Sequence, residues 1–343
     1  SDLIIKHFEG ILLDWFPNFP GEKTHMNKRK IISETKAIIF IVLTVLMVKV
    51  TVLEAYIVPT GSMENTIMTG DFLIGSRFVY GMRTPDWIGI PYTDIGFDLP
   101  YIVFPKFRKA KQGDIIIFKY PRDTHQKYVK RCIALPGDTV EIQARRVYVN
   151  GREYGQPEHG KFQGRMDEPG WNNPMIFLGN KGNKDHFKPL RVPKKGDEIA
   201  VTPANAQLLL HLMVLDGHKV TIKSELKEYM FTMTDPENLL RRKKNESVFD
   251  DYYPIGNKIN PWMRNLPNGE LYIDGKSIKE IPHYTVEQDY FWAMGDNRDD
   301  SYDSRFWGFV PREYLLGEAL FVYMSLNFKT KLPRLDRVGT VLN

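Results

Sequence analysis

The stretch Tyr128-Val-Lys-Arg-Cys-Ile-Ala-Leu-Pro-Gly-Asp138 is an apolar run that ends in a turn and carries Lys130 near its start. Strand alternation places Tyr128, Lys130 and Cys132 on one face. A lysine in such surroundings either reaches solvent from an edge strand or is desolvated. Desolvation would bring its pKa from about 10.4 to about 7–8, leaving a neutral amine able to accept a proton. From this stretch alone, both interpretations stay open.

The Gly-Asp ending of this stretch recurs elsewhere in the chain, each time before a run rich in β-branched residues. Four runs follow this pattern, at Gly70-Asp71, Gly113-Asp114, Gly137-Asp138 and Gly196-Asp197. A turn that feeds such a run predicts a strand. Asn-Gly and Asp-Gly corners in Val147–Gly151 and Leu271–Gly275 predict two hairpins. The sequence therefore predicts a mostly β fold, with a short helix near residues 205–213.

An apolar segment precedes the predicted strands. Residues 37–48 read AIIFIVLTVLMV, and extension through Val58 makes the stretch long enough to cross a bilayer, although it then contains Lys49 and Glu54. The Lys49 ammonium can reach the headgroups if it lies near one face. A buried helix is the alternative, and we favour a transmembrane anchor over residues 37–56.

The residues before this segment set its expected orientation. Within residues 22–36, just before the segment, there are five basic residues and two acidic ones, which predicts a cytoplasmic N-terminus and a single pass. The basic residues are Lys23, Lys28, Arg29, Lys30 and Lys36, and the acidic ones are Glu22 and Glu34. The chain begins at Ser1 rather than Met, which leaves open a preceding segment.

Composition excludes several classes of protein. A net charge of +5 over 343 residues, with no domain-wide basic stripe, argues against a nucleic-acid partner. Cys132 is the single cysteine, so no internal disulfide can form. No motif implies a metal or an organic cofactor. The Pro-, Gly- and aromatic-rich residues 86–107 form either a loop that rests on a bilayer or a packed hairpin.

A serine follows the apolar segment closely, in Pro59-Thr-Gly-Ser-Met63. The chain from Thr51 to Ser62 can extend about 36 Å at most, so Ser62 would lie near the membrane surface. Thr60 occupies the first glycine position of a Gly-x-Ser-x-Gly elbow, and Asn65 the lysine position of Ser-x-x-Lys, so neither motif is present. The eight histidines are scattered. Locally, Ser62 could be a nucleophile or an ordinary turn residue.

Three separated motifs, taken together, resemble those of bacterial type I signal peptidases, a family of Ser-Lys dyad proteases. They are Ile57–Met63 running on to Gly70-Asp71, Tyr128–Arg131 running on to Leu135–Asp138, and the long segment Met294–Pro311. The resemblance covers roughly residues 38–142 and 285–325. It implies a β-rich catalytic domain of the signal peptidase/LexA-like β fold, following a single N-terminal transmembrane helix and interrupted by a large inserted α+β subdomain.

The resemblance also implies domain boundaries. They are a cytoplasmic segment 1–36, an anchor 37–56, a catalytic β domain 57–142 and 287–330, a variable insert 143–286, and a C-terminal tail 331–343. The catalytic domain would lie on the outer, periplasmic side of the bacterial inner membrane.

The same resemblance implies the catalytic roles. Ser62 would be the nucleophile and Lys130 the general base, with the Ser62 N–H and the Thr60 hydroxyl forming the oxyanion hole. Ser301 would orient the Lys130 amine. Asp303 and Arg305 would form a supporting ion pair near Arg131, and Gly295, Asp296, Asn297 and Arg298 would shape the turn that brings Ser301 to the lysine.

Substrate contacts follow from the expectation that an extended peptide pairs with the strands on either side of the dyad. The candidate residues are Tyr56, Val58, Met63, Ile67, Tyr128 and Val129, with a purely structural role in the core as the alternative. Tyr302 stands where the family often has a small residue, and could narrow a substrate pocket.

The expected partners are signal peptides of exported preproteins and the lipid bilayer, with the export translocon as a further candidate. Two other interpretations are a LexA-like self-cleaving repressor and a β scaffold that binds peptides without cutting them. The first needs an N-terminal helix-turn-helix, where this chain has a basic flank and an apolar segment. Intact Ser62, Lys130 and Ser301 argue against the second.

Overall fold

The computed structural model describes residues 33–41, 53–81, 87–89, 96–100, 102, 104–105, 107–225, 227–231, 258–262 and 266–342. The chain divides into two units, residues 1–48 and 49–343. In the first unit, residues 33–41 form a helix on which Ile38, Ile39, Phe40 and Ile41 are each more than half exposed. None of the helices in the described residues is long and apolar enough to cross a membrane. Most of the expected anchor, residues 42–52, lies outside the described residues, and its last four residues, 53–56, belong to a strand instead.

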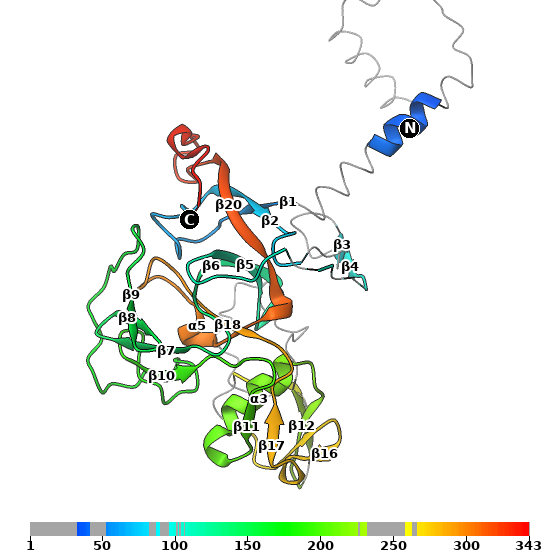
Figure 1. Ribbon diagram of the computed structural model, residues 1–343, viewed down its shortest axis with the longest axis vertical. Coiled ribbons are helices and arrows are strands. Elements are labelled where there is room, and N and C mark those ends of the chain that lie inside the picture. Colours follow the sequence, from blue (N-terminus) through cyan, green and yellow to red (C-terminus); the bar gives the residue numbers. More distant parts are fainter. Residues whose placement is uncertain are drawn as a thin grey trace, which may run out of the picture. The chain divides into compact units, whose positions relative to one another are not determined.

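The second unit is built on a seven-stranded antiparallel sheet, so the predicted β fold is confirmed (Figure 1). In sheet order its strands are β1 (Leu53–Ile57), β2 (Asp71–Ser76), β20 (Leu315–Ser325), β5 (Ile115–Tyr120), β6 (Asp123–Ala134), β18 (Tyr290–Met294) and β19 (Val310–Pro311). The sheet therefore joins strands from both ends of the unit.

The four Gly-Asp turns share one geometry, and each precedes a strand as predicted. The strands are β2, β5, β7 (Thr139–Gln143) and β11 (Glu198–Ala200). Each glycine has a φ near +90°, a conformation that side chains disfavour. Each aspartate carboxylate accepts the N–H of the residue three positions earlier, as Asp114 does from Lys111 at 2.8 Å. The short side chain thus satisfies a backbone donor where the strand begins.

The region between β6 and β18 contains a second, four-stranded sheet in the order β10 (Phe187–Arg191), β7, β8 (Arg146–Val149) and β9 (Arg152–Tyr154). A five-stranded sheet follows the order β14 (Lys258–Ile259), β13 (Glu228–Phe231), β12 (Val220–Lys223), β15 (Glu270–Ile273) and β16 (Lys276–Ser277). β17 (His283–Thr285) pairs with β11, and β3 (Trp87–Gly89) with β4 (Gly96–Asp98). Both predicted hairpins are confirmed, at β8–β9 and β15–β16, with positive φ at both corner residues.

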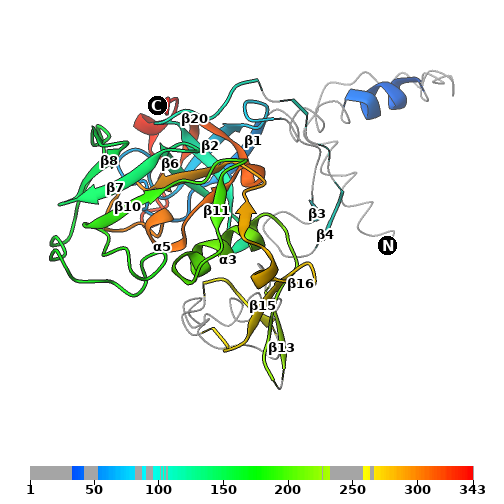
Figure 2. The same ribbon diagram turned by 60° about the horizontal axis from the view of Figure 1, so that its bottom comes forward.

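Helices are few among the residues described. α3 spans Ala206–Leu215, close to the predicted helix, and α5 spans Ser304–Trp307. Four short 3₁₀ turns complete the list: η1 (Pro203–Asn205), η2 (Ile278–Glu280), η3 (Arg312–Tyr314) and η4 (Leu335–Arg337). Figure 2 shows α3 on the same side of the seven-stranded sheet as β11 and β15.

The region 143–286, expected as an inserted subdomain, shares a hydrophobic core with the main sheet. One buried cluster contains Ile142 and Phe187 of the second sheet, Leu212 of α3, and Trp292 of β18. The Phe187 and Trp292 rings lie 5.3 Å apart between centroids. Because this packing reaches the strand that leads into residues 295–301, the insert is structurally coupled to that loop.

Two further expectations concern surface segments. Residues 87–89 and 96–98 form the β3–β4 hairpin, while Ile102 and Phe107 nearby in sequence are 65% and 77% exposed, so both interpretations of residues 86–107 stay open. Residues 331–342 belong to the segment expected as a C-terminal tail. They fold back on β20, where Val341 pairs with Phe321, and Leu342 is buried.

Candidate active site

The Lys130 side chain is only 4% exposed, which supports the desolvated alternative for this lysine over one that reaches solvent. On β6, Lys130 pairs with Ile116 of β5, and β18 pairs with β6 only from Arg131 onward, so among the residues described no strand pairs with the other edge of β6 at Lys130. Its Nζ donates to Ser62 Oγ at 2.6 Å and to the Val129 carbonyl at 3.1 Å. Burial lowers the pKa of Lys130 to about 8, although the Asp303 and Asp296 carboxylates act in the opposite direction.

Ser62 is carried by a tight loop between β1 and β2, here called the Ser62 loop, residues 58–70. The loop closes where Gly70 N–H donates to the Val58 carbonyl at 2.8 Å. Asn297, in the third motif, holds this loop in place. The Asn297 N–H donates to the Ser62 carbonyl at 3.1 Å, and its side-chain amide donates to the Gly61 carbonyl at 3.0 Å. The third motif therefore binds the first through the two consecutive backbone carbonyls of Gly61 and Ser62.

Asp296 is the partner of Arg131, and sequence reasoning did not find this pair. The Arg131 guanidinium binds the buried Asp296 carboxylate through two hydrogen bonds, at 2.9 and 2.8 Å. The same carboxylate accepts from Thr66 Oγ1 at 2.6 Å. Asp296 thus links β6 to the Ser62 loop. The sequence placed Asp296 only in a turn, and the signal that could have found it is its position within the long motif Met294–Pro311.

Asp303 and Arg305 form the expected ion pair, fully buried, with an Arg305–Asp303 contact of 2.8 Å. Burial by itself would raise the pKa of Asp303, but the Arg305 guanidinium outweighs it and holds that pKa below its usual range. Asp303 also accepts the Gly295 N–H at 3.0 Å. The pair supports the turn at Gly295, while Arg131 has its own carboxylate in Asp296.

Ser301 makes no hydrogen bond to Lys130 in the structure. Its hydroxyl is buried, lies near enough to Asp303 to favour the charged carboxylate, and has no hydrogen-bond partner among the residues described. A Cβ placed on Gly295 would overlap both the Ser301 hydroxyl and the Ser62 carbonyl. Ser301, Gly295 and Ser62 are therefore packed together. Ser301 lies beside the nucleophile but does not make the contact with the Lys130 amine that was expected of it.

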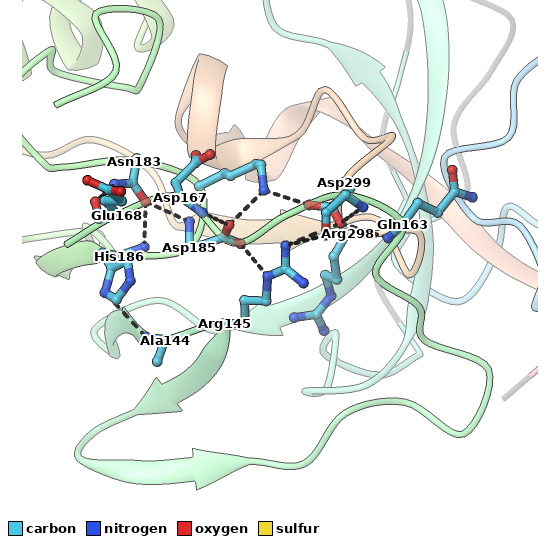
Figure 3. A network of polar contacts seen from close by, with 12 residues as sticks. Ala144, Arg145, Gln163, Asp167, Glu168, Asn183, Asp185, His186, Arg298 and Asp299 are labelled. Atoms are coloured by element: carbon cyan, nitrogen blue, oxygen red, sulfur yellow. Dashed lines mark hydrogen bonds and ion pairs between the residues drawn. The ribbon is translucent and has the colours of Figure 1, made fainter. Parts of the chain in front are cut away.

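Residues of the insert bind the far side of the third motif (Figure 3). The Asp299 carboxylate accepts from the backbone N–H groups of Gln163 and Gly164, at 2.7 and 2.8 Å, and from Lys184 Nζ at 2.6 Å. Burial opposes the charge, but Lys184 and the two N–H groups lower the pKa of Asp299 to about 2. Arg145 lies 3.6 Å from the same carboxylate.

A second contact of the insert reaches the Ser62 loop itself. Lys161 Nζ lies 2.6 Å from the Glu64 carboxylate. The Lys161 backbone donates to the Asp296 carbonyl and accepts from the Arg298 N–H, both at 2.9 Å. The insert therefore contacts both loops that meet at Ser62.

The residues expected to contact substrate fall into two groups. Tyr56, Val58, Met63 and Ile67 are buried in one hydrophobic cluster, against which Val129 packs. Tyr128 stacks on Tyr120 at 4.4 Å between ring centroids. Met63 and Ile67 are at most 1% exposed, which fits the core alternative for these two residues.

Thr60 and Tyr302 differ in their surroundings. Thr60 is exposed, two residues before Ser62. Tyr302 stacks on Phe306 and its hydroxyl accepts from Arg122 at 3.0 Å. Its edge also meets Tyr120, so Tyr302 belongs to the aromatic cluster that begins at Tyr128.

The strands β1 and β6 approach each other near the dyad without pairing. Among the residues described, β1 pairs with no strand except β2. On β6, β18 pairs only with Arg131, Cys132 and Ala134. Side chains bridge the two strands, because Lys127 Nζ on β6 lies 2.6 Å from the Glu54 carboxylate on β1 and 5.5 Å from the Tyr56 ring. The described residues contain no group of three or more side chains that could hold a metal ion.

Comparison with known proteins defines the class. A family model described as signal peptidase, peptidase S26, matches residues 31–324, so the chain belongs to this family of peptidases. The chain is 23% identical over 335 residues to signal peptidase I of Buchnera aphidicola subsp. Acyrthosiphon pisum (strain APS), covering 94% of this chain and 87% of that protein. It is 28% identical over 292 residues to signal peptidase I of Aquifex aeolicus (strain VF5), covering 83% and 81%.

A crystal structure of a signal peptidase I from Enterococcus faecalis V583 is 18% identical and covers 62% of this chain and 97% of that one, but its TM-score of 0.22 supports no structural argument. The family match and the named relatives confirm the resemblance seen in the three motifs. The chain is a hydrolase of the bacterial type I signal peptidase class.

Proposed function

We propose that the chain is a membrane-anchored serine endopeptidase that removes N-terminal signal peptides from exported preproteins, with Ser62 and Lys130 as its catalytic dyad. The observation that carries the proposal is the 2.6 Å contact between Lys130 Nζ and Ser62 Oγ in a buried setting. Burial favours the neutral amine, which is the form that can accept the serine proton.

The chemistry follows from this geometry. Ser62 Oγ attacks the scissile carbonyl while its proton passes to the neutral Lys130 Nζ. Collapse of the tetrahedral intermediate breaks the C–N bond, and the Lys130 ammonium gives its proton to the leaving amine. Water then attacks the acyl-enzyme with Lys130 again as base, which releases the signal peptide and regenerates Ser62. Ser301, packed beside Ser62, would orient the lysine during these transfers.

The oxyanion would be held by the Ser62 N–H and the Thr60 hydroxyl. Among the residues described, the Ser62 N–H donates no hydrogen bond and is available for this role. Thr60 is exposed at the rim of the loop, where its hydroxyl can turn toward a bound carbonyl. Asn297 binds the carbonyls of Gly61 and Ser62. The Gly61 carbonyl and the Ser62 N–H belong to one peptide unit, so this N–H is held in place before substrate arrives.

An extended signal peptide would lie between β1 and β6. Each strand has an edge without a strand partner in the described part of the chain near the dyad, so main-chain hydrogen bonds could form on both sides of the peptide. Tyr56, Val58, Tyr128 and Val129 lie on these two strands or directly after them. Met63 and Ile67 would support these substrate-contacting residues from within the core.

A membrane anchor before β1 would tether the catalytic unit to the bilayer that its substrates enter. The helix at residues 33–41 exposes four consecutive large apolar side chains, Ile38 to Ile41, which favours burial in lipid. Because β1 begins at Leu53, the span would lie within residues 37–52. The positive flank before it favours a cytoplasmic N-terminus, with the catalytic unit on the outer side of the inner membrane.

The test is cleavage of a preprotein by the purified full chain and by its Ser62→Ala and Lys130→Ala variants. We expect each variant to lose at least about 10³-fold in kcat/KM, since either member of the dyad is needed for acylation. Lys329→Ala, at an exposed position outside the site, is a control for protein quality. Processing at the normal rate by either dyad variant would rule out the proposed chemistry. Protease protection of residues before 37 in intact spheroplasts tests the orientation.

A further inference from the structure

The C-terminal segment, residues 326–342, folds back onto the sheet edge that carries the Ser62 loop. Leu326 N–H donates to the Gly70 carbonyl at 2.9 Å, at the end of that loop. Further along, Gly339 and Leu342 donate to carbonyls of β20, and the Leu342 side chain joins the hydrophobic cluster under Met63. The segment is therefore fastened at both of its ends.

Two arginines of this segment bind one buried carboxylate. Asp71 is fully buried at the end of the Ser62 loop. Arg337 lies 2.6 Å from its Oδ2 and Arg334 lies 3.4 Å from its Oδ1, where Ser325 also donates at 2.6 Å. A buried carboxylate needs such partners, because an uncompensated charge in the interior is strongly unfavourable.

The same guanidinium groups also reach backbone carbonyls of the Ser62 loop. Arg337 Nη2 donates to the Thr66 carbonyl at 2.9 Å, and Arg334 Nη2 donates to the Thr69 carbonyl at 2.7 Å. Because a guanidinium is planar with fixed donors, binding Asp71 and a carbonyl together fixes the loop relative to the C-terminal segment.

Thr66 is held from its other side by the catalytic strand. Its hydroxyl donates to Asp296, which binds Arg131, the residue directly after Lys130. One residue of the Ser62 loop therefore receives a contact from the C-terminal segment through its carbonyl and a contact from the lysine's strand through Asp296. The position of Ser62 relative to Lys130 depends on both contacts.

We propose that residues 326–342 act as a clamp on the Ser62 loop, with Arg337 and Arg334 as positioning residues for the nucleophile. The inference rests on the proposed Ser62–Lys130 dyad and adds to it a structural cause for the short Nζ–Oγ distance. A displacement of about 1 Å at a reacting atom can lower a rate about 10²-fold, so loss of the clamp should reduce turnover without removing a reacting group.

The experiment uses the full chain and its Arg337→Gln variant in preprotein cleavage, with Lys329→Gln as the matched control. Lys329 is an exposed cation of the same segment, and its side chain makes none of these contacts. We expect Arg337→Gln to lower kcat about 10- to 100-fold with little change in KM, and Lys329→Gln to match the parent. Loosening the loop should also admit water beside Lys130, so the apparent pKa in the kcat/KM profile should move upward from about 8.

A second variant guards against simple unfolding. Arg337→Lys keeps a cation for Asp71, but the lysine Nζ ends short of the Nη2 position from which Arg337 binds both Asp71 and the Thr66 carbonyl, so we expect an intermediate kcat at a Tm close to the parent's. Parent-like kcat and pH profile in both Arg337 variants would overturn the clamp while leaving Ser62→Ala inactive. Activity retained by Ser62→Ala would instead overturn the dyad, so the two failures are distinguishable.

Discussion

Lys130 Nζ and Ser62 Oγ lie 2.6 Å apart although 68 residues separate them in the chain. Three features set this contact: the pairing of β6 with β5 at Lys130, the short Ser62 loop, and Asn297, which binds the carbonyls of Gly61 and Ser62. Because only the neutral Lys130 amine can accept the Ser62 proton, the protonation of Lys130 decides whether the pair can react. The first prediction follows from that protonation.

Cleavage should depend on pH through Lys130. Its pKa is lowered to about 8 by burial, and only the neutral amine can accept the Ser62 proton. We expect kcat/KM to fall about tenfold per pH unit below pH 7 and to level off above pH 9. Initial rates on one preprotein between pH 5 and 10 measure this. Full activity at pH 5 would contradict a lysine base.

The same burial should make Lys130 unfavourable for stability. Its folded-state pKa lies below the value near 10.5 of the free side chain, so the unfolded chain binds the extra proton between about pH 8 and 10.5, and stability rises with pH across that window. We expect Lys130→Met to be inactive but more stable than the parent, by up to about 3 kcal/mol below pH 8. Urea unfolding at pH 7 and pH 10.5 tests this, and a gain that does not shrink at pH 10.5 would count against it.

Gly295 should tolerate no side chain. A Cβ there would overlap the Ser301 hydroxyl and the Ser62 carbonyl, so Gly295→Ala must displace the loop that carries the nucleophile. We expect kcat/KM to fall by at least about 10²-fold. Gly164→Ala is the matched control, since its Cβ would meet Asp299 at an ordinary 3.7 Å. Equal activities in the two variants would refute the steric argument.

Removing one partner of the Arg131–Asp296 pair should strongly destabilise the fold. Both side chains are buried, so Asp296→Ala leaves a buried guanidinium without its carboxylate, and we expect a loss of about 3–5 kcal/mol in the free energy of unfolding. Replacing both, as Arg131→Met with Asp296→Leu, should recover much of that loss because no buried charge remains. A double-mutant cycle by chemical denaturation gives the coupling, and additive effects would show that the pair is not coupled.

Asp299 should contribute acid sensitivity through its contact with the insert. Its pKa is lowered to about 2, so its stabilising contribution is complete above about pH 4 and is lost as the pH falls toward 2. We expect Asp299→Asn to flatten the dependence of unfolding free energy on pH in that range, by about 1 kcal/mol after solvent screening. Asp336→Asn, at an exposed position, should leave the slope unchanged. If the unfolding free energy of the parent and of Asp299→Asn depended on pH with the same slope, the contacts of Asp299 with the insert would not contribute to acid sensitivity.

Local sequence predicted the strands and the turns between them, since backbone conformation follows from neighbouring residues. Glycine permits the φ near +90° at each Gly-Asp turn, and the adjoining carboxylate caps a backbone N–H three residues away. Asn150-Gly151 and Asp274-Gly275 likewise take the two positive φ values that a tight hairpin needs. The three motifs then supplied the family, and with it Ser62 and Lys130.

Only the tertiary structure decided what holds those two residues together. Arg131 and Asp296 are 165 positions apart in the sequence, and Asp71 and Arg337 are 266 positions apart, so no local pattern indicates that they pair. The protonation of Lys130 likewise depends on how completely the sheet and loops exclude water from its amine. The sequence by itself thus determined strands, turns and candidate groups, while burial and long-range ion pairs, which depend on the whole fold, set their distances and charges.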